Sequence, residues 1–385
     1  MRRIGVFCLF TPLGETDPTI IHTIKSMHEI TDYLIIVVNG SINSKDKLSE
    51  YADEVVIRKN IGFDIGAYKD IILSPECINK IKEADELVLC NSSFFGPFIT
   101  FQEIFEKMEG STCDFWGISS SETNLSQHIQ SYFYVFRRRI LEGEALFCYL
   151  KEKVNPERLD YFDACSIFEN GLFHTLKRAG YRFDAYKRSI GCDCYQNPYG
   201  SVKLDGLPVL KRKIFSKEFY QEKRVISALS YIKETYGFDI DPIIDYARLT
   251  YGIELISREI EAVRMDNQEP LERDVICDSD AASWEEIERF IVKHQNVYIY
   301  GNGVMAKIVY SSFFFYEKNP RLKGFVVSDQ QAVSAENFKG YPIYRYSEIK
   351  DGRDIAFIVA LNKRNTRDVF PQLSQVKNVM FLWRC

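Results

Sequence analysis

Alternation between short apolar runs and helix-like segments is the feature that most constrains the fold of this chain. Residues 3–9 and the run "DYLIIVVNGS" (32–41) predict buried strands, and residues 17–30 between them carry apolar side chains at helical spacing. Further strands are predicted at 53–59 and within 85–98. This alternation predicts an α/β fold, a mainly parallel sheet with helices on both faces.

Polar segments follow three of these predicted strands. They are Asn39, the stretch "NIGFDIGAYKD" that begins at Asn60, and the loop 91–97. In open α/β sheets, ligands bind outside the carboxyl ends of the strands. We therefore expect the three segments to face one crevice.

The stretch "NIGFDIGAYKD" has the residues of a ligand loop. Gly62 and Gly66 permit close backbone approach, and amides at the start of the next helix favour an anionic group. Asp64 could accept hydrogen bonds from ribose hydroxyls or a base, and Phe63 or Tyr68 could pack against a flat ring. The alternative is a tight turn in which Asp64 only caps the helix.

Two further polar groups follow or precede predicted strands. Asn91, Ser92 and Ser93 suit a phosphate, a metal-bound water or a sugar hydroxyl, although turns rich in Asn and Ser are common. The second group precedes an aromatic strand, a pattern typical of sugar sites, and a lone histidine there is more often structural. Its members are His128, Gln130 and Ser131.

A candidate general base lies on the predicted helix 162–180. Glu169 stands among apolar residues, where a carboxylate tends to have a raised pKa that suits proton abstraction. The alternative is a glutamate on the solvent face, and Asp163 is a rival base. Farther along, Lys211 and Arg212 could hold a diphosphate leaving group, or form a solvated run of surface charge.

The last part of the chain predicts a second, small Rossmann-like domain with four strands. Gly301 and Gly303 belong to a G-x-G-x-x-A match between a strand and a helix, and Asp329 follows a later strand. A lone match is weak evidence, so we do not expect NAD there. The predicted domains are an α/β domain (1–215), a helical connector or cap (216–290) and the Rossmann-like domain (291–385).

Composition limits the function classes. The net charge of −5 gives no general attraction to nucleic acid. No segment approaches the ~20 apolar residues of a membrane-spanning helix, so we expect a cytoplasmic protein. The ten cysteines include no spacing that completes a zinc site.

Six motifs in order carry a resemblance to a known family. They are "NIGFDIGAYKD", "LVLCNSSFFGPF", "DFWGIS", "HIQSYFYVF", "ENGLFHTLKRAGY" and "GLPVLKRKIF". Together, over about residues 1–215, they resemble the rhamnan synthesis protein F family, glycosyltransferases of bacterial surface polysaccharides such as lipopolysaccharide O-chains and rhamnans. The resemblance implies a GT-A-like fold, a nucleotide-sugar donor and a lipid-linked or polysaccharide acceptor.

The resemblance also implies roles for the residues. Asp64 becomes a nucleotide contact, and the 91–93 loop becomes the counterpart of a motif that holds Mg²⁺ or Mn²⁺ on the donor diphosphate. The family usually has Asn-Asp-Ser at this loop, whereas this chain has Ser92 in place of the acid. Either Asn91 and another acid hold the ion, or catalysis is metal-independent with Lys211 and Arg212 carrying the phosphate charge, or activity has been lost. Glu169 would deprotonate the acceptor in a single inverting displacement, and the enzyme would associate peripherally with the inner membrane.

Two other function classes stay open. An NAD-dependent enzyme acting on a nucleotide-sugar would use the Gly301 loop as its active centre. A non-catalytic scaffold of a polysaccharide assembly complex would account for the missing acid at Ser92. Binding of nucleotide-sugars, of NAD or of neither would distinguish these classes.

Overall fold

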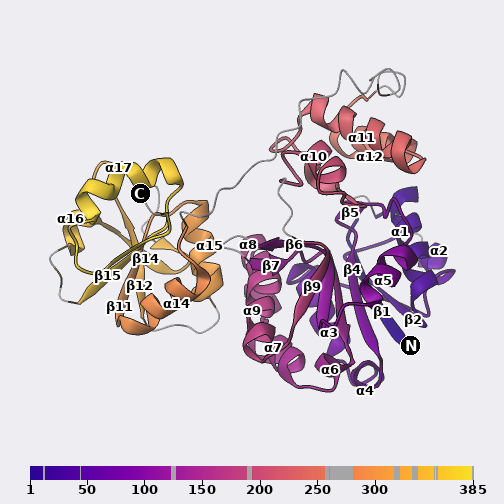
Figure 1. Ribbon diagram of the computed structural model, residues 1–385, viewed down its shortest axis with the longest axis horizontal. Coiled ribbons are helices and arrows are strands. Elements are labelled where there is room, and N and C mark those ends of the chain that lie inside the picture. The colour runs from indigo at the N-terminus through magenta and orange to yellow at the C-terminus, as the bar shows by residue number, and fades with distance from the viewer. Residues whose placement is uncertain are drawn as a thin grey trace. The chain divides into compact units, whose positions relative to one another are not determined.

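The computed structural model describes residues 1–11, 14–43, 45–122, 127–188, 193–255, 260, 281–315, 321–331, 337–350, 352 and 354–383. It divides into two compact units, shown with their elements in Figure 1. The first unit comprises Met1–Glu122, His128–Arg158 and Leu172–Ile276. The second comprises Thr123–Gln127, Leu159–Gly171 and Cys277–Cys385.

The strands of the first unit form one large sheet and a small two-stranded sheet. The large sheet contains β1 (Arg3–Leu9), β2 (Tyr33–Asn39), β3 (Glu54–Arg58), β4 (Glu86–Asn91), β6 (Phe115–Glu122), β7 (Gln127–Ile129), β8 (Phe133–Arg137) and β9 (Phe183–Lys187). The small sheet pairs β5 (Phe94–Phe95) with β10 (Leu210–Lys211) in antiparallel orientation.

The strand order of the large sheet is β3-β2-β1-β4-β8-β6-β7, with β9 beside β6. The first four strands in this order are parallel, and β8 runs antiparallel to both β4 and β6. The prediction of an α/β fold is confirmed. Because Cys8 lies opposite Asn91 and Asn39 lies opposite Arg58, the carboxyl ends of four strands are level at one edge.

The helices of the first unit cover both faces of this sheet. They are α1 (Pro18–Ile30), α2 (Lys45–Ser49), α3 (Phe63–Ile72), α4 (Ile78–Lys82), α5 (Phe101–Glu109), α6 (Arg138–Leu141), α7 (Ala145–Lys153), η1 (Pro156–Arg158) and α9 (Leu172–Arg178). Ile24 of α1 and Ile104 of α5 share one buried core with strand residues such as Val88. Helix α3 packs against β1 and β2.

A helical group closes the first unit. It contains α10 (Pro198–Lys203), η3 (Arg212–Phe215), α11 (Glu222–Tyr236) and α12 (Asp241–Tyr251). Phe95 of β5 and Leu210 of β10 share a core with Leu229 of α11 and Ile243 of α12. Helices α11 and α12, which lie within the predicted connector 216–290, thus pack on the small two-stranded sheet.

The second unit contains a parallel sheet with helices on both faces. Its elements are α8 (Tyr161–Ser166), η2 (Ile167–Gly171), α14 (Trp284–Lys293), β11 (Asn296–Tyr300), α15 (Val304–Phe313), β12 (Leu322–Val327), β13 (Asn337–Phe338), β14 (Tyr341–Arg345), α16 (Tyr346–Ile349), β15 (Ile355–Val359), α17 (Lys363–Leu373) and β16 (Val379–Phe381). The strand order is β13-β14-β12-β11-β15-β16. Among the described strands of this sheet, only β13 runs antiparallel to its neighbour.

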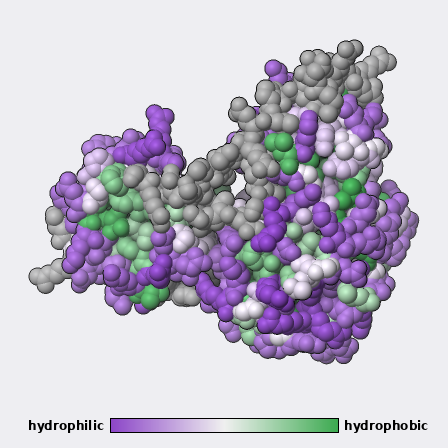
Figure 2. All heavy atoms as spheres, viewed as in Figure 1, coloured by the Kyte–Doolittle hydropathy of each residue, from purple (hydrophilic) through white to green (hydrophobic). Residues whose placement is uncertain are grey.

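On the face that Figure 2 draws, hydrophilic residues predominate among the described residues, and hydrophobic residues lie between them. Exposed large apolar side chains include Phe10 and Ile61 in the first unit and Val292 in the second. None of the helices in the described ranges has the length and apolar character that crossing a membrane requires.

Candidate functional site

Three polar segments meet at the carboxyl edge of the first unit's sheet, as the sequence predicted. At the end of β4, the Asn91 Nδ2 donates to Asp64 Oδ2 at 2.7 Å. At the end of β2, the Asn39 Nδ2 donates to the Phe63 carbonyl at 2.9 Å. The start of α3 is therefore held by side chains from two separate strand ends.

Arg58 braces this cluster, although the sequence analysis did not name it. Its Nη1 donates to Asn39 Oδ1 at 2.5 Å, and its Nη2 donates to the Ile61 carbonyl at 2.8 Å. Its Nε pairs with Asp70 Oδ2 at 2.8 Å. The sequence signal that could have identified Arg58 is its position near the end of the predicted strand 53–59. In the structure that strand pairs with β2, and Arg58 lies opposite Asn39.

The two glycines of this loop have structural reasons to be glycine. Gly62 caps α3 in a left-handed conformation (φ 76°), and a Cβ there would lie 2.5 Å from Pro156. A Cβ on Gly66 would lie 2.4 Å from the Ile61 carbonyl oxygen. Asp64 lies in the first turn of α3 rather than at its cap, and Phe63 is also left-handed at φ 57°.

The Asp64 carboxylate lies close to buried thiol and phenol groups. Burial is the main cause that raises the pKa of Cys8, and the Asp64 charge raises it further. Burial also raises the pKa of Tyr68, with Cys8 and then Asp64 adding to it. Tyr68 is fully buried, so its ring offers no surface to a ligand, whereas Asn60 is exposed.

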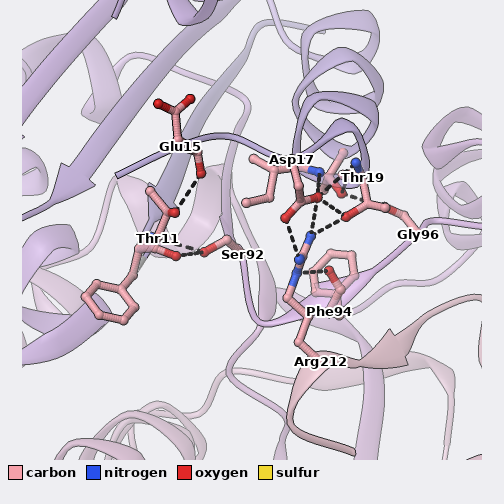
Figure 3. Close-up of polar contacts among 11 residues, drawn as sticks. Thr11, Glu15, Asp17, Thr19, Ser92, Phe94, Gly96 and Arg212 are labelled. Atoms are coloured by element: carbon pink, nitrogen blue, oxygen red, sulfur yellow. Dashed lines mark hydrogen bonds and ion pairs between the residues drawn. The ribbon is translucent and has the colours of Figure 1, made fainter. Parts of the chain in front are cut away.

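Ser92 holds the end of β1. Its Oγ accepts from the Phe10 N–H at 3.1 Å and donates to the Phe10 carbonyl at 3.2 Å (Figure 3). The Phe10 side chain is 51% exposed, so an aromatic ring with a fixed backbone lies at this edge. Sequence reasoning missed Phe10, because nothing local shows that it pairs with a residue 82 positions away.

The 91–93 loop does not fit a firmly held divalent ion. Asn91 Nδ2 bonds Asp64, Asn91 Oδ1 accepts from the Ser93 N–H at 3.1 Å, and the Ser92 hydroxyl is bonded to Phe10. Divalent ions of this kind prefer several carboxylate and water oxygens. Within the described part of the chain, no three His, Cys, Asp or Glu side chains cluster as ligands.

Arg212 is buried beside the helix α1 rather than exposed to solvent. Its guanidinium pairs with Asp17 (Nη1–Oδ2, 2.8 Å), donates to Thr19 Oγ1, and donates from Nε to the Phe94 carbonyl at 3.2 Å (Figure 3). It also lies over the Phe95 ring at 4.3 Å. Burial raises the pKa of Asp17, but the charge and hydrogen bonds of Arg212 outweigh burial and hold this pKa below 3.8.

Lys211 lies next to the strand-end cluster. It is buried, and its Nζ lies 4.0 Å from the centre of the Tyr132 ring. Burial raises the pKa of Cys90, the neighbour of Asn91, and the positive charge of Lys211 opposes that rise. Lys211 lies near Cys90 at the end of β4, and Arg212 lies beside the loop that follows, where its backbone N–H donates to the Ser93 carbonyl at 3.0 Å.

Tyr132 links the cluster to the second predicted polar group. Its carbonyl accepts from the Asn91 N–H at 3.1 Å, and its Oη bonds Ser119 Oγ at 2.8 Å. Ser119 Oγ in turn donates to Gln130 Oε1 at 3.2 Å. Ser131 is half-buried in the turn that precedes β8.

His128 lies in β7, near the buried His174 of α9. The pKa of His174 falls to about 3, chiefly through burial, and the charges of Lys177, Arg178 and His128 add to the effect. The edge strand β7 is separated from β4 by β8 and β6 in the sheet. The structure therefore does not bring His128 to the Asp64 cluster.

The two candidate bases occupy different environments. Asp163 is 2% exposed, accepts from Ser311 Oγ at 2.6 Å and pairs with Lys339 Nζ at 2.8 Å. Glu169 is partly buried and lies in η2, a π-helical turn. Since π-helical turns are frequent at functional sites, Glu169 is the stronger candidate.

In the second unit, the residues of the predicted nucleotide loop have structural roles. Gly301 is left-handed (φ 123°), and a Cβ there would lie 2.6 Å from the Ala360 carbonyl oxygen. Gly303 is the N-cap of α15, and a Cβ there would meet no atom within 4 Å. Asp329 Oδ1 accepts from Ser347 N–H at 3.0 Å and from Ser347 Oγ at 2.8 Å, and so holds the start of α16.

Comparison with known sequences gives one family and two groups of relatives. A family model described as rhamnan synthesis protein F matches residues 34–267, more than half of the chain. The uncharacterized protein y4gN of Sinorhizobium fredii is 27% identical over 124 residues, 31% of this chain and 32% of that protein. The virulence protein VirA of Vibrio anguillarum is 31% identical over 107 residues, 27% of this chain and 33% of that protein. The match thus spans about a third of each relative.

Solved structures show only distant likeness. The apo form of the glycosyltransferase GlyE from Streptococcus pneumoniae has a TM-score of 0.34 at 12% identity, covering 99% of this chain and 90% of that one. Glucosyl-3-phosphoglycerate synthase from Mycobacterium tuberculosis, in complex with Mn²⁺, UDP-glucose and phosphoglyceric acid, has a TM-score of 0.24 at 16% identity, covering 39% of this chain and 64% of that one.

Proposed function

We propose that this chain, which belongs to the rhamnan synthesis protein F family and is a glycosyltransferase, transfers a sugar from a nucleoside-diphosphate donor to a growing bacterial surface polysaccharide. The observation that carries the proposal is the convergence of Asn39, Asp64 and Asn91 at one sheet edge. Ligands of open α/β sheets bind at this kind of edge. Rhamnose is the first donor sugar to test, because the family is named for it.

In this proposal the donor nucleotide lies along the strand-end cluster. Asp64 accepts hydrogen bonds from ribose hydroxyls or the base, and the half-exposed Phe10 ring offers a flat face to the base. Lys211 neutralises the diphosphate as it leaves. Arg212 acts indirectly, since its guanidinium is already bonded to Asp17 and Thr19.

The proposed chemistry is a single displacement at the anomeric carbon. Glu169 takes the proton of an acceptor hydroxyl, the hydroxyl oxygen bonds the anomeric carbon, and the carbon–oxygen bond to the diphosphate breaks. The nucleoside diphosphate leaves with the electron pair of that bond. One displacement inverts the configuration, and the mechanism needs no metal. The proposed acceptor is lipid-linked or a polysaccharide end, met at the inner face of the membrane.

Substitution of the base tests the mechanism. Glu169→Gln should lower the transfer rate by about 10²- to 10⁴-fold, because the amide cannot accept the proton. Binding of UDP or dTDP should stay unchanged, since neither contacts Glu169 in this proposal. Glu152→Gln, an exposed glutamate of α7, is the matched control. Full activity of Glu169→Gln with a verified donor and acceptor would exclude the assigned base.

A thermal-shift screen tests the donor class separately. Nucleotide-sugars with UDP or dTDP should raise the melting temperature by preferential binding to the folded state. Repeating the screen with Mn²⁺ measures any metal dependence that the 91–93 loop does not suggest. A shift with NAD and none with nucleotide-sugars would replace the proposal with the NAD-dependent alternative. Absence of any shift would favour a scaffold.

A further inference from the structure

The segment that carries Glu169 is built into the second unit. Residues 159–171 group with Cys277–Cys385, and α8 packs against α15. The family model ends at residue 267, so the chain beyond the matched region supplies the surface on which this helix rests. The helical run that follows, α9, belongs to the first unit.

Specific polar contacts hold α8 in place. The buried Asp163 carboxylate receives Ser311 Oγ at 2.6 Å and Lys339 Nζ at 2.8 Å. Ser166 Oγ bonds Ser312 Oγ at 2.9 Å one turn farther along. A buried carboxylate with both a cation and a hydroxyl donor is a geometrically fixed contact rather than a loose surface pair.

Lys339 occupies an unusual position for a lysine. With Gly340 it forms the two-residue turn between β13 and β14, and both residues have positive φ (55° and 80°). Such turns favour Asn, Asp or Gly, because a side chain in the left-handed region is strained. The Lys339 ammonium bonds both Asp160 and Asp163, and its side chain is only 15% exposed. The strained turn thus places the Lys339 ammonium group against the start of α8.

We propose that Lys339 and Ser311 are positioning residues of the transferase, which set the orientation of Glu169 by fixing α8. This inference rests on the proposed role of Glu169 as base. Glu169 lies six residues after Asp163, about 9 Å along a helix axis, and the π-helical turn 167–171 intervenes. Because η2 follows α8 directly in the chain, a shift or rotation of α8 would move Glu169 with it.

Two substitutions test this role in the full-length chain. Lys339→Met and Ser311→Ala should each lower kcat, by about 10- to 100-fold for Lys339→Met, as expected for a misplaced base. The donor KM and the thermal shift with UDP or dTDP should change less than about twofold, because the donor contacts proposed above are elsewhere. Lys339→Arg should recover most of the rate, since it keeps the charge. Lys293→Met, an exposed lysine of α14, is the control.

The outcomes separate this inference from the proposed function. If folded Lys339→Met keeps the wild-type kcat, or loses donor binding together with kcat, the positioning role is wrong. If Lys339→Met fails to fold by circular dichroism, Ser311→Ala decides by the same two readings. If Glu169→Gln is fully active, the proposed base has failed first. Loss of activity in Glu169→Gln with none in Lys339→Met leaves the function intact and refutes only the positioning role.

Discussion

The carboxyl edges of the two sheets look alike in sequence but differ in what surrounds their acids. In the first unit, Asn91 at the end of β4 donates a hydrogen bond to Asp64 of α3, and Asn39 and Arg58 bond the backbone of the same turn. In the second unit, Asp329 is used to hold the start of α16 through Ser347. Both edges have a glycine turn between a strand and a helix.

This difference shows that the glycine spacing alone indicates only a turn between a strand and a helix. Polar side chains that converge from several elements are the better indication of a candidate ligand site. The first edge gathers polar groups from three strand ends and from α3, whereas the second uses its acid within one short loop. A nucleotide site is therefore better supported at the first edge.

The largest expected effect is the loss of the buried ion pair that braces the first edge. Arg212→Met should lower the free energy of unfolding by about 3–5 kcal/mol, because it leaves Asp17 charged and without its main partner. Arg248→Met breaks an exposed pair with Asp245, whose side chains are 52% and 57% exposed, and should cost less than about 1 kcal/mol. Urea unfolding measures both.

The same experiment can break the comparison. Ser347→Ala removes the hydroxyl bond to Asp329 at the second edge but keeps the bond from the Ser347 backbone N–H, and should cost less than about 1 kcal/mol. An equal loss for Ser347→Ala and Arg212→Met would show that the two edges are equally braced.

The Asp17–Arg212 pair should weaken only in acid. The pKa of Asp17 is held below 3.8, so the contribution of the pair to stability is complete above that value and is lost as pH falls through the lowered pKa.

Charge removal at the two acids tests which edge binds nucleotide. Asp64→Asn keeps the shape of the side chain but loses the charge, and should weaken UDP or dTDP binding by about 10- to 100-fold, the value of a charged hydrogen bond. Asp329→Asn should leave binding within about twofold. Isothermal titration of each variant measures this. The reverse pattern would move the nucleotide site to the second unit.

Much of this contrast could be predicted from the sequence, because it depends on periodicity. Continuous apolar runs predicted β1, β2 and β4, and their parallel order predicted that Asn39, the 60–66 loop and the 91–97 loop would converge. The strand β14 was missed: its residues are mostly half-buried and include Pro342, so the run has no continuous apolar pattern.

Contacts between distant side chains could not be predicted. The Phe10–Ser92 bonds span 82 positions and the Asp17–Arg212 pair spans 195, and no local pattern encodes either partner. For the same reason Arg212 was read as a phosphate contact, with a surface charge run as the alternative, while the structure buries it. Asp163 was read as a rival base, but its carboxylate bonds Ser311 and Lys339.

Acid should affect the first unit more than the second through its buried histidine. Burial is the main cause that lowers the pKa of His174 from 6.5 to about 3. Between these values the unfolded chain binds the proton and the folded chain does not, so stability rises with pH in this window. Lowering the pH from 7 to 5 should cost on the order of 2 kcal/mol, and His174→Phe should abolish that slope. His294→Gln, a half-buried histidine of the second unit, is the control.

The smallest expected effect separates the two glycine turns. Gly303→Ala should change the free energy of unfolding by less than about 0.5 kcal/mol, because a Cβ there meets no atom within 4 Å and the backbone is not left-handed. Gly66→Ala should cost about 1–3 kcal/mol, since its Cβ would lie 2.4 Å from the Ile61 carbonyl oxygen. Thermal unfolding at equal pH measures both. If Gly303→Ala proved as destabilising as Gly66→Ala, the two turns would be equally constrained. The second edge would then again be a candidate ligand site.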